Sequence, residues 1–376
     1  MKIAIDARPI NHHRRQGIFT CTEKLIYELA EIDTSNRYFL IYCSLRKKLD
    51  ELPGPGNVNF IKKIMRVPDR NFIFDKAYLS KVALPRFLKQ SGCNVFHSTF
   101  DTLRLKTKQC RYVLTIYDLK SLYVREDQWN QHLPSYAKAM KCADVIIAIS
   151  QSTKNDIVRH FSIPEQKVRV VYLGVDESFK KLDSQDVQAV LKKYGLTKRY
   201  FLTDGRVPRK NAERVIQAFA QFKYNNDYEL VLLGVTPDCM LVPRYKQLIE
   251  EYKLSERVKL IPNIESIAEM AALYNGAFCF IFPSLYEGFG LSVLEAMACE
   301  TPVITSNVSS LPEVGGDAVL YVEPQSVTDI MNAMTKMTDD NSLRQSLIDK
   351  GHNRIKMFSW RKMAAETLAI YKEVAQ

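Results

Sequence analysis

Two glutamates eight positions apart, Glu287 and Glu295, flank a glycine-rich turn at residues 288–290. The turn follows an apolar run that ends at Phe282, and this order predicts a strand, a loop and then a helix. A helix that starts near Gly290 presents free backbone N–H groups and the positive end of its dipole to an anion. Glu295 then lies about one turn inside that helix, where its carboxylate can accept hydrogen bonds from a ribose diol.

The alternative is an ordinary turn between a strand and a helix, with a solvated acid on each side. Glycine stands at the positions where the backbone must approach a ligand with no side chain in the way. The full string from 283 to 298 therefore favours an anion-binding loop.

Three basic residues, Arg206, Arg209 and Lys210, follow another apolar run at 200–203. Negative charge on a bound phosphate can be stabilised by a metal ion or by fixed cations. Arginine can bind a phosphate bidentately, and lysine acts as a mobile point charge. Since the sequence contains no Asp-x-Asp pair of the metal-dependent kind, we expect these cations, and no metal, to supply that stabilisation. A solvated basic turn is the alternative.

At these residues the chain resembles the retaining nucleotide-sugar glycosyltransferases of family 4, which have the GT-B fold. The resemblance spans most of the 376 residues and is specific mainly in the second half. Within the family, the chain resembles the bacterial mannosyl- and rhamnosyltransferases of surface-polysaccharide pathways. It continues through residues 301–306, 309–314 and 316–318, backward to 204–211, and more loosely through 5–8, 17, 97–98 and 115–118.

The resemblance implies roles for the residues of the second half. Glu287 would contact the donor sugar and stabilise charge, not act as a nucleophile, and Lys210 with Arg206 or Arg209 would bind the leaving diphosphate. Which arginine makes the closer contact stays open. The rest of the donor pocket would consist of Gly288, Phe289, Gly290, Leu291, Ser292 and Glu295.

In the first half, the resemblance brings Gly17 close to the donor phosphate, in a basic loop that includes His12 and His13. These histidines are either acceptor contacts or solvated loop residues. Tyr117-Asp118 stands where family members carry His-Asp, a departure that puts the contact of residue 117 with the donor sugar in doubt. His97, at the end of another strand, is a weaker candidate for the wall of the site.

The implied reaction moves a hexose or deoxyhexose, with GDP-mannose as first donor, to a growing lipid-linked glycan in polysaccharide or O-antigen synthesis. Same-face attack, with the leaving phosphate taking the acceptor proton, requires no dedicated base and no cofactor. A GT-B nucleotide-sugar 2-epimerase and a non-enzymatic polyanion-binding protein are the alternatives. An oxidoreductase is disfavoured because no G-x-G-x-x-G follows the first strand.

Short apolar runs alternate with helical patterns along the whole chain, which predicts an α/β protein of parallel sheets. We expect the GT-B arrangement of two doubly wound, Rossmann-like domains that face a central cleft. The domains are predicted at 1–175 and 176–357, with a helix at 358–376 that returns to the first domain. Predicted strands are 2–7, 38–43, 58–61, 95–98, 112–116, 145–150, 168–171, 200–203, 229–234, 258–260, 278–282, 303–305 and 319–321.

The net charge of +11 is concentrated in residues 1–180, where 30 Lys and Arg stand against 18 Asp and Glu. This asymmetry indicates attraction to an anionic surface. Residues 61–89 interleave basic and apolar residues at helical spacing, as in a helix that lies on a membrane or one that packs on a core with a solvated basic face. The basic residues are not interleaved with aromatics on a sheet, so nucleic acid is not an expected partner.

The chain shows no signal-peptide pattern and no run of eighteen apolar residues, so we expect a cytoplasmic protein, peripheral on the cytosolic membrane face. Eight scattered cysteines without a C-x-x-C pair predict reduced, mostly buried thiols.

Overall fold

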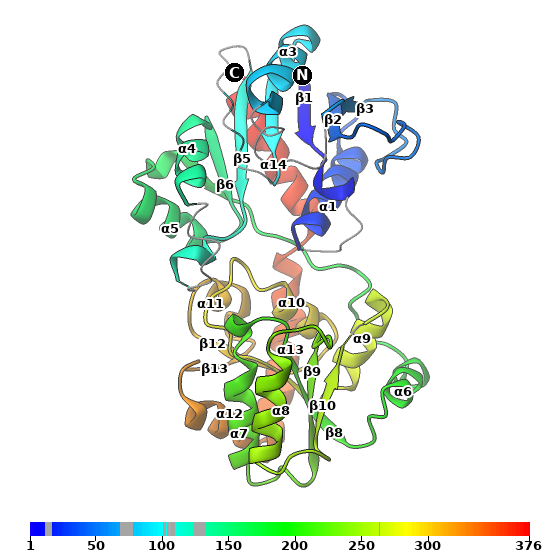
Figure 1. Cartoon of the computed structure of the whole chain (residues 1–376), viewed down its shortest axis with the longest axis vertical. Helices are drawn as coiled ribbons and strands as arrows, with labels where there is room; N and C mark the ends of the chain where they lie inside the picture. The colour runs from blue at the N-terminus through cyan, green and yellow to red at the C-terminus, as the bar shows by residue number, and fades with distance from the viewer. Residues whose placement is uncertain are drawn as a thin grey trace. The chain divides into compact units, whose positions relative to one another are not determined.

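The computed structural model describes residues 1–11, 17–67, 78–100, 103, 105, 110–123, 133–262 and 264–376. They form two compact units (Figure 1). Unit 1 consists of Met1–Gly174 together with Ser359–Gln376, and unit 2 consists of Val175–Phe358. No helix among the described residues is long and apolar enough to cross a membrane.

Unit 1 is built on a seven-stranded parallel sheet in the order β3-β2-β1-β4-β5-β6-β7. Its strands are β1 (Lys2–Asp6), β2 (Arg37–Cys43), β3 (Phe60–Met65), β4 (Val95–Ser98), β5 (Arg111–Ile116), β6 (Val145–Ala148) and β7 (Val168–Val170). Its α-helices are α1 (Gly17–Ile32), α3 (Leu84–Ser91), α4 (Leu133–Cys142), α5 (Gln151–Phe161) and α14 (Trp360–Val374). Shorter helical turns are η1 (Pro9–Asn11), η2 (Leu79–Ala83), η3 (Lys120–Leu122) and η5 (Glu165–Lys167).

Unit 2 is built on a six-stranded parallel sheet in the order β10-β9-β8-β11-β12-β13. Its strands are β8 (Arg199–Asp204), β9 (Tyr228–Leu233), β10 (Val258–Ile261), β11 (Cys279–Phe282), β12 (Val303–Ser306) and β13 (Leu320–Val322). Its helices are α6 (Ser184–Lys193), α7 (Ala212–Gln221), α8 (Val242–Glu251), α9 (Ile267–Gly276), α10 (Leu291–Ala298), α11 (Leu311–Gly315), α12 (Val327–Asp339) and α13 (Asn341–Arg354), with the turns η6 (Pro208–Lys210) and η7 (Ile355–Met357).

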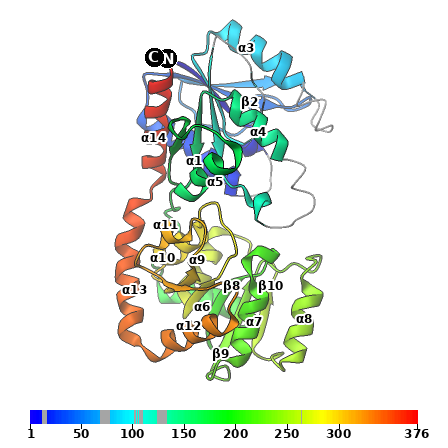
Figure 2. The same cartoon turned by 90° about the vertical axis from the view of Figure 1, so that its left-hand side faces the viewer.

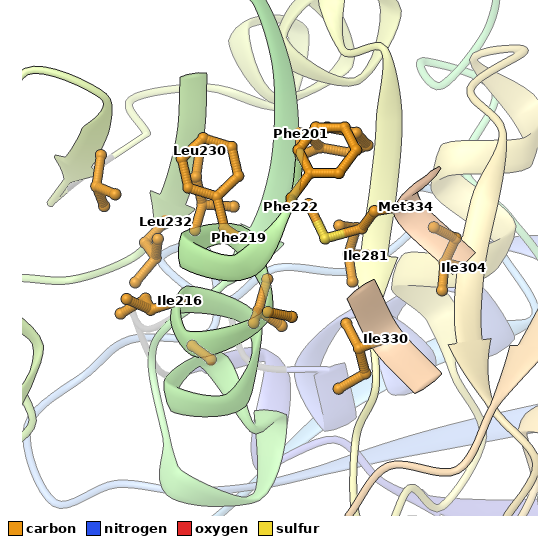
Figure 3. Close-up of a cluster of buried hydrophobic side chains, with 14 of the residues drawn as sticks. Phe201, Ile216, Phe219, Phe222, Leu230, Leu232, Ile281, Ile304, Ile330 and Met334 are labelled. Atoms are coloured by element: carbon orange, nitrogen blue, oxygen red, sulfur yellow. The ribbon is translucent and has the colours of Figure 1, made fainter. Parts of the chain in front are cut away.

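The core of unit 2 forms where α7 packs on the sheet (Figure 3). Residues 215, 216 and 219 recur at helical spacing and are fully buried, so α7 has one apolar face. Ile216 and Phe219 contribute to the same buried cluster as Leu230 and Leu232 of β9. Strand β9 is buried along its whole length, as expected for an interior strand, with a neighbour on each side, of a parallel sheet that is covered on both faces.

The strand order of each sheet reverses at one point, between β1 and β4 in unit 1 and between β8 and β11 in unit 2. In an open parallel sheet, connections on the two sides of such a switch point leave in opposite directions. The carboxyl ends of the two strands therefore border a crevice in which ligands bind. The loops after β8 and β11 are the two that the sequence assigns to the donor.

Helix α14 packs against α1 and so completes unit 1 from the far end of the sequence (Figures 1 and 2). Its Tyr371 is fully buried, and the hydroxyl oxygen lies 2.6 Å from Nδ1 of His97 on β4. Gly174, the last residue of the first segment, lies so close to Trp360 that a Cβ would stand 2.2 Å from its backbone nitrogen. Only glycine fits there without a shift of backbone.

All thirteen predicted strands are present, and the α/β class with two Rossmann-like units is confirmed. Helices α6 and α11 were not among the helical patterns expected between the strands: α6 buries only Val187 and Leu191, and α11 has five residues, so each offers few apolar positions. All eight cysteines are free thiols, and all but Cys142 and Cys239 are buried.

The helical interpretation of residues 61–89 is wrong at its start. Phe60–Met65 is the edge strand β3, with Ile61 and Lys63 exposed and, among the strands that the structure describes, only β2 as a neighbour. The apolar residues at 61 and 64 have helical spacing, but pairing with β2 decides the local structure. Leu79–Ser91 is helical as predicted, whereas Phe72 and Phe74 lie outside the described residues.

Candidate functional site

The site lies at the switch point of unit 2, where the loops after β8 and β11 meet. The first loop leaves Asp204 and turns through η6 before α7, and the second runs from Pro283 to Gly290 before α10. The backbone N–H of Leu285 donates to the carbonyl of Arg209 at 2.8 Å, so the two loops are joined directly.

Glu287 is the centre of the site. Its carboxylate oxygen Oε1 accepts hydrogen bonds from Nη1 of Arg209 at 2.5 Å, from Nζ of Lys210 at 2.7 Å and from Oγ of Ser284 at 2.8 Å. Glu287 and Lys210 are each 7% exposed, so the ion pair is shielded from water. The structure thus brings Glu287 together with two predicted residues, Arg209 and Lys210, that stand far from it in the sequence.

The pKa values of this cluster follow from burial and charge. Burial alone would raise the pKa of Glu287, but the charges of Lys210 and Arg209 outweigh it and lower the pKa to about 2. Burial lowers the pKa of Lys210, while Glu287 and Asp204 oppose that change. A carboxylate with so low a pKa is ionised at neutral pH and is a poor proton acceptor.

Arg206 lies in the first of these two loops and pairs with a carboxylate other than Glu287. It forms a bidentate pair with Asp204, with Nε to Oδ1 at 3.0 Å and Nη2 to Oδ2 at 2.6 Å, and 57% of its side chain is exposed. The stem of Arg206 lies over Gly234, where a Cβ would stand 2.2 Å from its Cγ. Asp204 also lies 3.8 Å from Lys210 Nζ. Three cations against the carboxylates of Asp204 and Glu287 leave a positive excess on these loops.

Serine and asparagine side chains hold the two loops in place. The backbone N–H of Glu287 donates to Ser309 Oγ at 3.0 Å, and Ser310 Oγ donates to the carbonyl oxygen of Phe289 at 2.7 Å. Asn211 has φ 68°, a left-handed conformation that asparagine tolerates, and its side-chain amide donates to the carbonyls of Pro283 and Pro324. The role of these residues is not apparent in the sequence, because their contacts depend on which strands are neighbours.

The start of α10 has the predicted form. Gly290 has φ 117°, and a Cβ there would meet Leu311 Cδ2 at 2.9 Å, so glycine is required. Leu291 and Ser292 stand in the first helical turn, where backbone N–H groups lack intrahelical acceptors. Phe289 is 3% exposed and packs edge-on against Phe358, with ring centroids 5.8 Å apart. Residues Gly288 and Phe289 can therefore offer a ligand only their backbone.

Glu295 stands in α10 on the side of Arg206. Burial raises its pKa to about 7, against the opposing influence of the Arg206 charge and of a hydrogen bond from the Tyr274 hydroxyl. That hydrogen bond is long, 3.4 Å between the two oxygens. Glu295 is thus a half-buried carboxyl group without a strong partner among the described residues, and it titrates near neutral pH.

The predicted site residues of unit 1 include Gly17, Tyr117 and Asp118. Gly17 opens α1, and a Cβ there would contact no described atom within 4 Å. Tyr117 lies beside Cys21 and Thr22 of α1, and burial raises its pKa well above the ordinary value. Asp118 Oδ1 accepts from the backbone N–H of Lys120 at 3.4 Å. His12 and His13 lie outside the described residues.

The interpretation of His97 as part of a site wall is wrong. His97 is 1% exposed, and its Nε2 lies 2.7 Å from the hydroxyl oxygen of Thr115 while Nδ1 faces Tyr371. Burial lowers its pKa to about 3, so the ring is neutral. His97 connects β4, β5 and α14 inside the core.

Family comparisons match both halves of the chain. Residues 22–179 match the family described as "Glycosyltransferase Family 4", and residues 186–354 match "Glycosyl transferases group 1". Within the described residues, no cluster of three or more His, Cys, Asp or Glu side chains is arranged to hold a metal ion.

Among similar proteins, the "O-antigen chain mannosyltransferase B" of Escherichia coli is 30% identical over 272 residues, which is 70% of either chain. The "Serotype-specific mannosyltransferase WbdA" of Escherichia coli is 32% identical over 251 residues, 65% of this chain but only 31% of the relative. A solved sucrose-phosphate synthase from Thermosynechococcus elongatus superposes with a TM-score of 0.78 at 20% identity and covers 99% of this chain and 98% of its own.

Proposed function

Because this chain belongs to glycosyltransferase family 4 and has the GT-B fold, we propose that it is a retaining enzyme that transfers a hexose or deoxyhexose from a nucleoside diphosphate sugar to a growing glycan. The observation that carries the proposal is the cluster of Lys210, Arg209 and Glu287 at the switch point of unit 2, beside the start of α10.

The loop cations are suited to a leaving diphosphate. Carboxylate partners hold Arg206 and Lys210 in place, and the first turn of α10 adds unpaired N–H groups. Fixed cations and dipoles aimed at developing charge are an effective source of transition-state stabilisation. This chemistry requires no metal or cofactor, and we propose that none is used.

Glu287 serves in this proposal as an ionised anchor and sugar contact. Its pKa of about 2 makes it a poor general base. The acceptor proton would therefore pass to the leaving phosphate, with attack on the same face of the sugar, and the anomeric configuration would be retained. Glu295 would accept hydrogen bonds from the ribose hydroxyls.

The mannosyltransferase names of the two Escherichia coli relatives support mannose as the first sugar to test. We propose GDP-mannose as its donor. The O-antigen relative also supports a polysaccharide acceptor, which we propose to be lipid-linked. Exposed basic side chains of unit 1, among them Lys63 and Arg66 of the β3 segment, would face an anionic membrane surface.

A panel of nucleotide sugars tests the donor. A donor that binds the folded state at 100 times its Kd should stabilise it by about 2.7 kcal/mol and so raise the melting temperature. The bound donor is then incubated with polyprenyl-linked acceptors, and NMR of the product reports the anomeric configuration. Inversion of configuration would exclude the retaining mechanism. Conversion of the donor sugar without an acceptor would favour the 2-epimerase, and the absence of binding by every donor would favour polyanion binding.

A further inference from the structure

A cavity of unit 2, with a volume of about 280 Å³, lies at the amino ends of the strands. Arg199 begins β8 and Phe278 immediately precedes β11, so the cavity is at the opposite sheet edge from the loops after Asp204 and Phe282. Ile348 of α13 closes another side. The cavity is therefore separate from the donor site of the same unit.

Two arginines in this cavity stack on one aromatic ring. The guanidinium carbons of Arg199 and Arg344 lie 4.6 Å and 4.7 Å from the centroid of the Phe278 ring. The distance between the two carbons is therefore at most the sum of these two distances. The ring is held in turn by Phe201 and Tyr228, whose centroids lie 5.4 Å and 5.1 Å away. Phe278 thus holds two like charges in one cavity.

Neither of these guanidinium groups has a hydrogen bond or an ion pair with any residue that the structure describes. By contrast, Arg206 and Arg209 of the same unit are both held by carboxylates. The cavity also contains Lys181, whose Nζ lies 3.4 Å from Glu300, a pair with both side chains exposed and hence weak. Three cations against one carboxylate leave the lining with a positive excess.

We propose that this cavity binds a small phosphate monoester or inorganic phosphate. Planar guanidinium groups donate two parallel hydrogen bonds to a phosphate, and a dianion would offset the repulsion between Arg199 and Arg344. The side chains of Ile348 and Pro302 offer an apolar wall for a short organic group. The volume is slightly below the range of about 300–1,000 Å³ that is usual for ligand pockets, which suits a small ligand.

The test measures binding of two probes, inorganic phosphate and glycerol 3-phosphate, to the full chain by calorimetry at fixed ionic strength. The Arg199→Ala/Arg344→Ala variant should weaken binding of the better probe by about tenfold or more, because charge-assisted hydrogen bonds are lost. Tighter binding of glycerol 3-phosphate assigns the site to a monoester, and equal or tighter binding of inorganic phosphate assigns it to the free anion.

Three further variants separate the cavity from general attraction to a basic protein. Lys192→Ala/Lys246→Ala removes two exposed cations elsewhere on unit 2 and should leave the affinity unchanged. Ile348→Trp fills the cavity without a change of charge and should weaken binding, which keeps the test informative if the double arginine variant fails to fold. Arg206→Ala, in the loop after β8, should leave the affinity of the cavity for the better probe unchanged.

Three results would overturn the proposal: no binding of either probe, equal affinities in the arginine and lysine double variants, or loss of binding in Arg206→Ala with retention in Arg199→Ala/Arg344→Ala. The last would place the anion at the donor site.

Discussion

The buried ion pair of Glu287 makes a testable contribution to the stability of unit 2. We consider Glu287→Gln, which keeps the shape of the side chain and removes its charge. In the wild type, Lys210 and Arg209 bind the ionised carboxylate at 2.7 Å and 2.5 Å. The amide can still accept hydrogen bonds from both cations but offers no compensating charge, so the variant should be less stable at neutral pH.

The magnitude follows from the pKa of Glu287. The pKa falls from 4.5 to about 2 on folding, and each unit corresponds to about 1.4 kcal/mol, so ionised Glu287 contributes about 3 kcal/mol at pH 7. Since the folded pKa is the lower one, the contribution is complete well above pH 4.5 and disappears as the pH falls toward 2. By pH 3, about 2 kcal/mol should be lost.

The assay is urea unfolding followed by circular dichroism, for wild type and Glu287→Gln, at several values between pH 7 and pH 3. Tryptophan fluorescence is unsuitable, because both tryptophans of the sequence, Trp129 and Trp360, fall within the ranges of unit 1. Glu213→Gln is the matched control: Glu213 pairs with Arg244 at 3.0 Å, but both side chains are about two-fifths exposed, and its loss should cost under about 1 kcal/mol. A stability difference between wild type and Glu287→Gln that stays constant from pH 7 to pH 3 would refute the reasoning.

Other predictions concern ligands. Glu295→Ala should weaken nucleoside diphosphate binding by about 1.5–3 kcal/mol in calorimetry, because a charged hydrogen-bond acceptor is lost; unchanged affinity would remove Glu295 from the ribose site. Wild-type affinity should rise as the pH increases through about 7, where Glu295 ionises, and Glu295→Gln should abolish that dependence. Turnover should survive EDTA and be lost in Lys210→Ala; chelator inactivation reversed by magnesium or manganese would contradict this. Sedimentation with liposomes should require anionic lipid, decline with salt, and weaken when Lys62, Lys63 and Arg66 become glutamate; equal binding to neutral vesicles would exclude the membrane proposal.

The elements of the site could be predicted from the sequence because each has a local signature. Gly290 marks a backbone position with positive φ, and the apolar runs before Arg206 and Glu287 mark buried parallel strands. Ligand loops in such sheets follow the carboxyl ends of strands, so the two loops could be expected to meet. The roles of the predicted site residues in binding and catalysis stay predictions.

The details of the site could not be predicted, because they depend on strand order and on packing. Ser309 follows β12 and reaches Glu287 only because β12 lies beside β11. Asp204 was not expected to neutralise Arg206, and Lys210 was not expected to be buried. The edge strand β3 was misinterpreted in part because exposed strand residues do not show a strict alternation of apolar and polar side chains.

The return of α14 to unit 1 has a consequence for synthesis of the chain. A ribosome completes all of unit 2 before it makes Trp360–Val374, so unit 1 must wait with α1 uncovered and with His97 lacking Tyr371. Domains generally fold as units during synthesis, and here the unit made first would be the one completed last. Newly made chains that stop before α14 should therefore contain a folded unit 2 and a protease-sensitive unit 1.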